Sequence, residues 1–127
     1  MRLIALTITA LIALLHVYIA WFEIFAWTSK GPEIFSVLPL DLFEPTIPMA
    51  ANQGIYNGFL AAGLAWALKI KDQEWQTNVA TCFLLFVAVA GIFGAMTITP
   101  KTLFIQTVPA IAALAFLHLS VLLAKKP

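Results

Sequence analysis

The chain has 127 residues, of which 62% are hydrophobic and 10% are charged, and its formal net charge is +1. Ordinary soluble domains are about 45–50% apolar and about 25% charged. So few charges cannot cover the surface that a small soluble domain exposes to water. The composition therefore excludes an ordinary soluble domain and a disordered chain, and the low net charge excludes a nucleic-acid partner. With the single cysteine Cys82, no intramolecular disulfide can form, and no metal site is predicted.

Four stretches are long and apolar enough to cross a bilayer, which requires about 20 residues of helix. They cover residues 3–27, 49–68, 79–96 and 102–124, and none shows the period-2 alternation of strands. We therefore predict an all-α, single-domain protein over residues 1–127: an integral membrane bundle of four transmembrane helices in the lipid bilayer. A cleaved signal peptide fits poorly, because the first apolar run continues to Trp27 with no clear cleavage site after Leu15.

Basic residues are distributed unevenly between the ends of these spans. The amino end, the second loop and the carboxyl end carry Arg2, Lys69, Lys71, Lys125 and Lys126, whereas the first and third loops carry only Lys30 and Lys101. Lysine and arginine are enriched in cytoplasmic loops, so we predict that both termini are cytoplasmic. The bias is moderate and leaves a dual or inverted topology open.

The first loop, residues 28–48, is long and rich in proline, with Pro32, Pro39, Pro45 and Pro48. Loops of this length are often lids or binding loops. Its apolar residues favour a folded cap at the outer interface, with a short helix around residues 39–43. The alternative is a tether that rests on the lipid headgroups.

Polar residues inside a membrane span are costly unless they face protein or water, so their positions are informative. In the first span, Thr9, His16 and Glu23 are spaced by sevens and lie on one stripe of the helix. His16 and Glu23 are about 10 Å apart along the axis, so direct contact is not expected. Trp27 follows one turn after Glu23, and we interpret it as part of an aromatic belt at the membrane interface rather than as a cover for the carboxylate.

The second span divides into a polar face and a face of small residues. Its polar residues span about 140° of arc at 100° per residue; they are Asn52, Gln53, Tyr56 and Asn57. The opposite side carries Gly54, Gly58 and Ala62, a small-xxx-small series that allows another helix to approach closely. Because the third span carries Ala88, Gly91, Gly94 and Ala95, we predict that the second and third spans pack on each other.

In the predicted orientation, most of these polar groups lie in the outer half of the membrane beneath the first loop. The fourth span adds Gln106 near its outer end, where Pro109 can bend the helix. The predicted outward-facing polar pocket therefore consists of Glu23, His16, Asn52, Gln53, Tyr56, Asn57 and Gln106. His118 lies near the inner interface and is left out of this pocket.

Three functions fit this pocket, in order of preference. The first is binding or transport of a small molecule or ion, with Glu23 as the titrating group and the amides contacting the ligand. The second is an intramembrane enzyme that acts on a lipid-like substrate with Glu23 or His16 as acid or base. The third is an accessory or assembly protein with a structural polar network. No cofactor motif is present, and a transporter of this size is expected to be a homo-oligomer.

Two stretches carry a family resemblance. One runs from His16 to Trp27 (HVYIAWFEIFAW), and the other covers residues 50–63 (AANQGIYNGFLAAG). Together with Gln106, Pro109 and the Gly91/Gly94 pair, they resemble the small bacterial membrane proteins called domain of unknown function 1304. Phe22 stands where a leucine is expected, which puts little in doubt. The resemblance implies a four-helix fold in the bacterial cell (inner or plasma) membrane and implies no activity.

Overall fold

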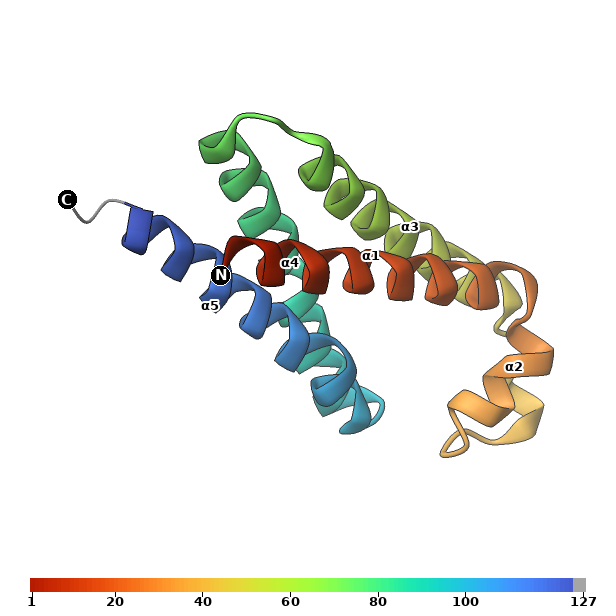
Figure 1. Ribbon diagram of the computed structural model, residues 1–127. Helices are drawn as coiled ribbons and strands as arrows, with labels where there is room; N and C mark the ends of the chain where they lie inside the picture. The colour runs from red at the N-terminus through yellow and green to blue at the C-terminus, as the bar shows by residue number, and fades with distance from the viewer. Residues whose placement is uncertain (125–127) are drawn as a thin grey trace.

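The computed structural model describes residues 1–124, and the regular elements of this part are all helices (Figure 1). In chain order they are α1 (Arg2–Phe25), α2 (Trp27–Ile34), the 3-10 helix η1 (Leu40–Leu42), α3 (Ile47–Lys69), α4 (Gln73–Thr97), the π-helix η2 (Leu103–Thr107) and α5 (Val108–Ala124). The predicted all-α class is confirmed. Lys125 and Lys126, which contribute to the predicted orientation, lie outside the described residues.

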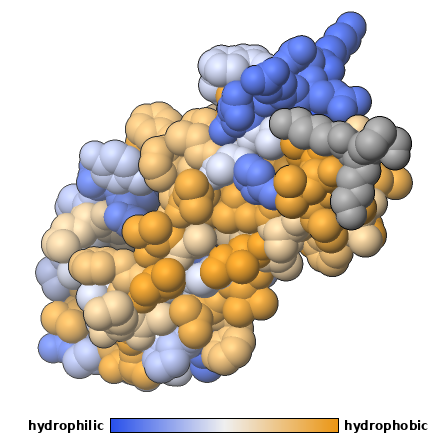
Figure 2. Space-filling view, turned by 90° about the vertical axis from the view of Figure 1, so that its left-hand side faces the viewer, coloured by the Kyte–Doolittle hydropathy of each residue, from blue (hydrophilic) through white to orange (hydrophobic). Residues whose placement is uncertain are grey.

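Three helical segments of the described chain are long and apolar enough to cross a membrane: α1, α4 and the run Leu103–Ala124 that η2 and α5 form. α3 has 23 residues but is less apolar, because amides and glycines occupy its first half. Large hydrophobic side chains are exposed along the helices, and Figure 2 shows them over most of one face. Soluble monomers rarely expose so large an apolar surface, which suits a membrane environment instead.

The helix boundaries follow local residue preferences. α1 ends where Ala26 leaves the helical conformation, at φ −134° and ψ 23°. α3 carries Pro48 in its first turn, where the missing N–H costs nothing. α4 begins after Asp72, whose carboxylate accepts a hydrogen bond from the Trp75 backbone N–H at 2.7 Å.

The segment predicted as a loop, residues 28–48, is folded. α2 continues the chain from Trp27 to Ile34, so the prediction of a loop is wrong for that part. The short helix predicted around residues 39–43 is present as η1. We call residues 27–46 the cap. Its folded form favours the first of the two interpretations of the loop.

α3 packs most extensively along α1, and the two run side by side in Figure 1. α3 also contacts α4, as predicted for the second and third spans. The prediction that this contact uses the small face of α3 is wrong for Gly54. A Cβ at Gly54 would lie 2.7 Å from Ile24 Cγ1 and 3.1 Å from the Ala20 carbonyl oxygen, both in α1. Gly58, one turn later, has no neighbouring atom within 4 Å of such a Cβ, and Ala62 is exposed.

The small residues of α4 instead pack against the segment that precedes α5, residues 102–107. A Cβ at Gly91 would lie 2.9 Å from the backbone nitrogen of Thr107, and one at Gly94 would lie 3.1 Å from Thr102 Cγ2. The Thr107 hydroxyl donates to the Ala88 carbonyl oxygen at 3.0 Å. The predicted partner of these glycines was therefore wrong, because the chain that returns directly after α4 occupies their face.

Arg2 ties the start of α1 to the turn between α3 and α4. Its guanidinium donates to Gln76 Oε1 at 2.6 Å and to the Gln73 carbonyl oxygen at 3.0 Å. Gln76 Nε2 in turn donates to the carbonyl oxygens of Ala67 and Ile70, at 3.2 and 3.0 Å. These bonds gather Arg2 and the α3–α4 turn at one end of the molecule, next to the buried apolar core.

The opposite end of the molecule is divided into two parts. The cap extends from the ends of α1 and α3 on one side, and the turn between α4 and η2 lies on the other (Figure 1). The candidate site lies between these two sides.

Candidate functional site

A cavity of about 760 Å³ lies between the cap side and the α4–η2 side of the divided end. α1, α3, α4, η2 and the cap all contribute lining residues, and most of them are apolar or aromatic. Cavities that bind small molecules measure about 300–1,000 Å³ and combine apolar walls with a few convergent polar groups. This cavity has both properties.

The most buried polar pair of the cavity is Glu23 of α1 and Asn57 of α3. Asn57 Nδ2 donates to Glu23 Oε2 at 2.8 Å and also to the Gln53 carbonyl oxygen, at 3.3 Å. Both residues are 7% exposed and line the cavity. Gly54 permits this bond, because its missing side chain allows α3 to approach the backbone of α1 beside Glu23.

The structure brings together five of the seven predicted site residues. Gln53, Tyr56 and Gln106 line the cavity with Glu23 and Asn57. Gln53 and Tyr56 are exposed, and Gln106 is half-buried. Asn52 is exposed and does not line the cavity. It lies about 140° around α3 from Asn57, so a helix that turns one of them inward turns the other outward.

His16 is fully buried but does not line the cavity. Its Nδ1 lies 2.8 Å from the Ile12 carbonyl oxygen, and because a carbonyl can only accept, Nδ1 carries the proton. Nε2 is buried without a hydrogen-bond partner among the described residues. The structure therefore separates His16 from the group around Glu23.

Aromatic side chains of the cap form one wall of the cavity. The Trp27 ring lies 5.2 Å from the Phe43 ring and 5.7 Å from the Phe35 ring, measured between centroids. Trp27 Nε1 donates to Thr46 Oγ1 at 3.0 Å. The fold of the cap therefore turns the Trp27 ring toward the cavity, and the interpretation of Trp27 as an interface belt residue stays a prediction.

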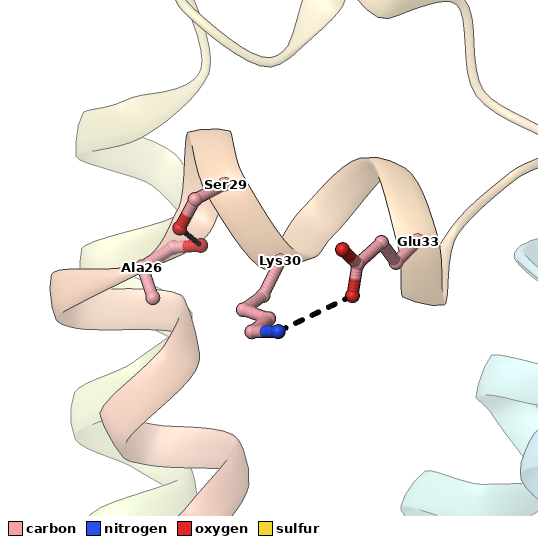
Figure 3. A network of polar contacts seen from close by, with 4 residues as sticks. All are labelled: Ala26, Ser29, Lys30 and Glu33. Carbon is pink, nitrogen blue, oxygen red and sulfur yellow. Dashed lines mark hydrogen bonds and ion pairs between the residues drawn. The ribbon is translucent and has the colours of Figure 1, made fainter.

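α2 is amphipathic, with Trp27 and Ile34 lining the cavity and polar residues on its exposed side. Figure 3 shows that side: the Ser29 hydroxyl donates to the Ala26 carbonyl oxygen at 3.2 Å, and Lys30 Nζ lies 3.3 Å from Glu33 Oε2. Exposed ion pairs of this kind contribute about 0–1 kcal/mol. This pair is a surface feature and leaves the carboxyl of Glu23 as the acidic group inside the cavity.

The sequence did not predict the π-helix η2, which contains Gln106. The Val108 N–H bonds to the Leu103 carbonyl oxygen, five residues back. Pro109 follows immediately, lacks an N–H and crowds the preceding turn, which is a physical reason for the wider turn. Such π-turns occur frequently at functional sites. Within residues 1–124, no three histidine, cysteine or acidic side chains are close enough to hold a metal ion.

Fold and site together define an all-helical protein with membrane-length helices and a largely apolar cavity whose lining includes a buried carboxyl–amide pair. The chain belongs to the family described as Protein of unknown function (DUF1304), whose sequence model matches residues 10–118. The predicted resemblance is confirmed, and the matched range contains every predicted site residue.

The chain is similar to the uncharacterized protein YpaA of Lactococcus lactis subsp. lactis (strain IL1403). The two are 28% identical over 116 residues, which cover 90% of this chain and 96% of the relative. No solved structure matches the chain.

Proposed function

We propose that the protein binds a small, largely apolar molecule in the cavity, with the polar end of that molecule at Glu23 and Asn57. The observation that carries this proposal is a cavity of about 760 Å³ that reaches a buried carboxyl–amide pair. A protein with a purely structural polar network would fill this space with side chains.

The polar groups are arranged to orient one end of the bound molecule. Asn57 donates to Oε2 of Glu23, and no other described side chain donates to this carboxyl. Glu23 Oε1 and Asn57 Oδ1 therefore remain available to a ligand. Lining residues reach inward as far as Leu15, Leu60 and Ala90, in the middle parts of their helices. We therefore propose binding from one side rather than passage through the protein.

The cavity can be tested with azioctanol, a neutral eight-carbon alcohol that carries a photoreactive diazirine. In protein reconstituted into lipid nanodiscs, we expect saturable labelling of cavity-lining peptides that excess octanol competes. Ala90→Trp should weaken this labelling, because Ala90 lines the cavity and an indole at this position occupies part of its volume. Val89→Trp is the matched control, since Val89 is exposed on the same helix outside the cavity.

Labelled sites are located by mass spectrometry of peptides from each variant. Labelling spread over exposed helix faces, without competition by octanol and unchanged in Ala90→Trp, would contradict the proposed binding function.

We further propose that α3 crosses the membrane together with the three more apolar segments, and that both termini are cytoplasmic. α3 packs along α1, which supports a shared path through the bilayer. Arg2, Lys69 and Lys71 belong to the end where Arg2 contacts the α3–α4 turn, whereas Lys30 and Lys101 belong to the cavity end. The larger number of basic residues favours the first end as cytoplasmic.

Cysteine labelling tests this orientation in a Cys82→Ser background. A membrane-impermeant maleimide should modify Ser36→Cys, in the cap, on intact spheroplasts. Lys71→Cys, in the α3–α4 turn, should react only after permeabilisation. The reverse pattern would show that the cavity opens to the cytoplasm, and equal labelling of both would show a dual topology.

A further inference from the structure

The walls of the cavity are rich in aromatic rings. Seven aromatic side chains line it, including Phe22 and Tyr18 of α1, Trp27 and Phe43 of the cap, and Phe93 of α4. Aromatic rings carry negative electrostatic potential on their faces and attract cations that lose their water on binding. Walls of this kind favour a ligand that combines apolar groups with positive charge.

The charged groups of the cavity also favour a ligand with positive charge. Glu23 is the acidic lining residue and Lys101 the basic one, but Glu23 is buried and Lys101 is exposed, in the segment between α4 and η2. Water and salt screen the charge of an exposed lysine, whereas a buried carboxylate is screened little. The buried ionisable side chain of the cavity is therefore an acid, the carboxyl of Glu23.

The carboxyl of Glu23 also lacks a cationic partner in the described chain. The ion pair among residues 1–124 is Lys30–Glu33 on the cap surface, and the hydrogen-bond partner of Glu23 is the neutral amide of Asn57. A buried carboxylate is stabilised when a positive charge is brought next to it.

From these three observations we propose that the ligand is a hydrophobic organic cation, such as a protonated alkylamine that carries an aromatic group, a quaternary ammonium or a phosphonium ion. Its charged atom lies at the Glu23 carboxylate, and its apolar groups contact the aromatic wall of the cap. This inference rests on the proposed binding function and names the class of molecule that the cavity selects.

Tetraphenylphosphonium and tetraphenylborate test the inference, because they have almost the same size and shape but opposite charge. Both ions are measured by equilibrium dialysis against the protein in nanodiscs of zwitterionic phosphatidylcholine, with protein-free nanodiscs subtracted. We expect saturable binding of tetraphenylphosphonium to the unaltered protein and at least about tenfold weaker binding of tetraphenylborate, as cation–π and charge attraction predict.

Variants then locate the charge that selects the cation. Glu23→Gln removes the carboxylate but keeps an oxygen that accepts the hydrogen bond from Asn57, so the fold should be retained. We expect at least about tenfold weaker binding of tetraphenylphosphonium by this variant. Glu33→Gln is the matched control: it removes an exposed acid outside the cavity and should leave binding unchanged.

The outcomes separate this inference from the binding function on which it rests. Equal binding of the two ions, or tetraphenylphosphonium binding that Glu23→Gln leaves unchanged, overturns the cation proposal. If azioctanol still labels the cavity saturably, the proposed binding function stands although the cation proposal fails. Loss of saturable azioctanol labelling from the unaltered protein overturns both. The comparison of the two ions needs no variant, so a misfolded Glu23→Gln protein does not leave the proposal undecided.

Discussion

Gly54→Ala is expected to lower the free energy of unfolding by about 1–3 kcal/mol, the usual cost of inserting an atom into a well-packed contact. The added Cβ would lie 3.1 Å from the Ala20 carbonyl oxygen and 2.7 Å from Ile24 Cγ1. The backbone of α1 cannot rotate away as a flexible side chain can, so α1 and α3 must separate. That shift also moves Glu23, whose Cβ is 3.1 Å from the same position.

Gly58→Ala is the control for this prediction, one turn further along α3. No atom lies within 4 Å of its added Cβ, and alanine stabilises a helix interior by up to about 1 kcal/mol relative to glycine. We expect unchanged or slightly higher stability, measured by reversible unfolding in mixed detergent micelles followed by circular dichroism. Equal losses in the two variants would contradict the close contact of α1 and α3 at Gly54.

Asn57→Leu is the second change with a large expected effect. It removes the described donor to Glu23 and leaves a buried carboxyl unpaired, which costs about 1–3 kcal/mol in the free energy of unfolding. Asn52→Leu is the matched control on the same helix, because Asn52 is exposed and does not line the cavity. It should cost nothing measurable in the same unfolding assay.

A double-mutant cycle of Asn57→Leu with Glu23→Leu isolates the bond between the two side chains. Once both are apolar, no unpaired polar group remains, so the double variant should be more stable than the sum of the single losses predicts. Interhelical hydrogen bonds in membranes contribute about 0.6–2 kcal/mol, and the coupling should lie in that range. Additive losses would mean that Asn57 does not hold the Glu23 carboxyl.

Residue patterns predicted the helices and the neighbourhood of the site well. Apolar runs of membrane length correspond to α1, α4 and the Leu103–Ala124 segment, and the proline-rich segment around residues 39–43 contains the predicted short helix. Glu23 stood out as the acidic residue inside a span, and the amides of residues 52–57 were predicted to lie near it. Local composition decides these features, because a polar side chain within a membrane span must face protein or water, whichever helix its neighbour is.

The partners of each helix were not predictable in the same way. A series of small residues shows that a helix can approach another closely, but it does not say which one. Gly54 faces α1, and the glycines of α4 face the segment before α5, against the prediction. The packing of Gly54 against α1 sets the rotation of α3 about its own axis. This rotation brings Asn57 inward and leaves Asn52 outside.

The sequence by itself therefore determined an all-helical, apolar chain with a single acid inside a span and amides near it. Only the tertiary structure decided that Glu23 bonds to Asn57, that His16 stays outside the group, that the cap turns Trp27 toward the cavity, and that the cavity exists. The physical reason is that hydrophobicity and helix periodicity are local properties of the chain. A cavity and a hydrogen bond between residues 34 positions apart depend on how whole helices pack.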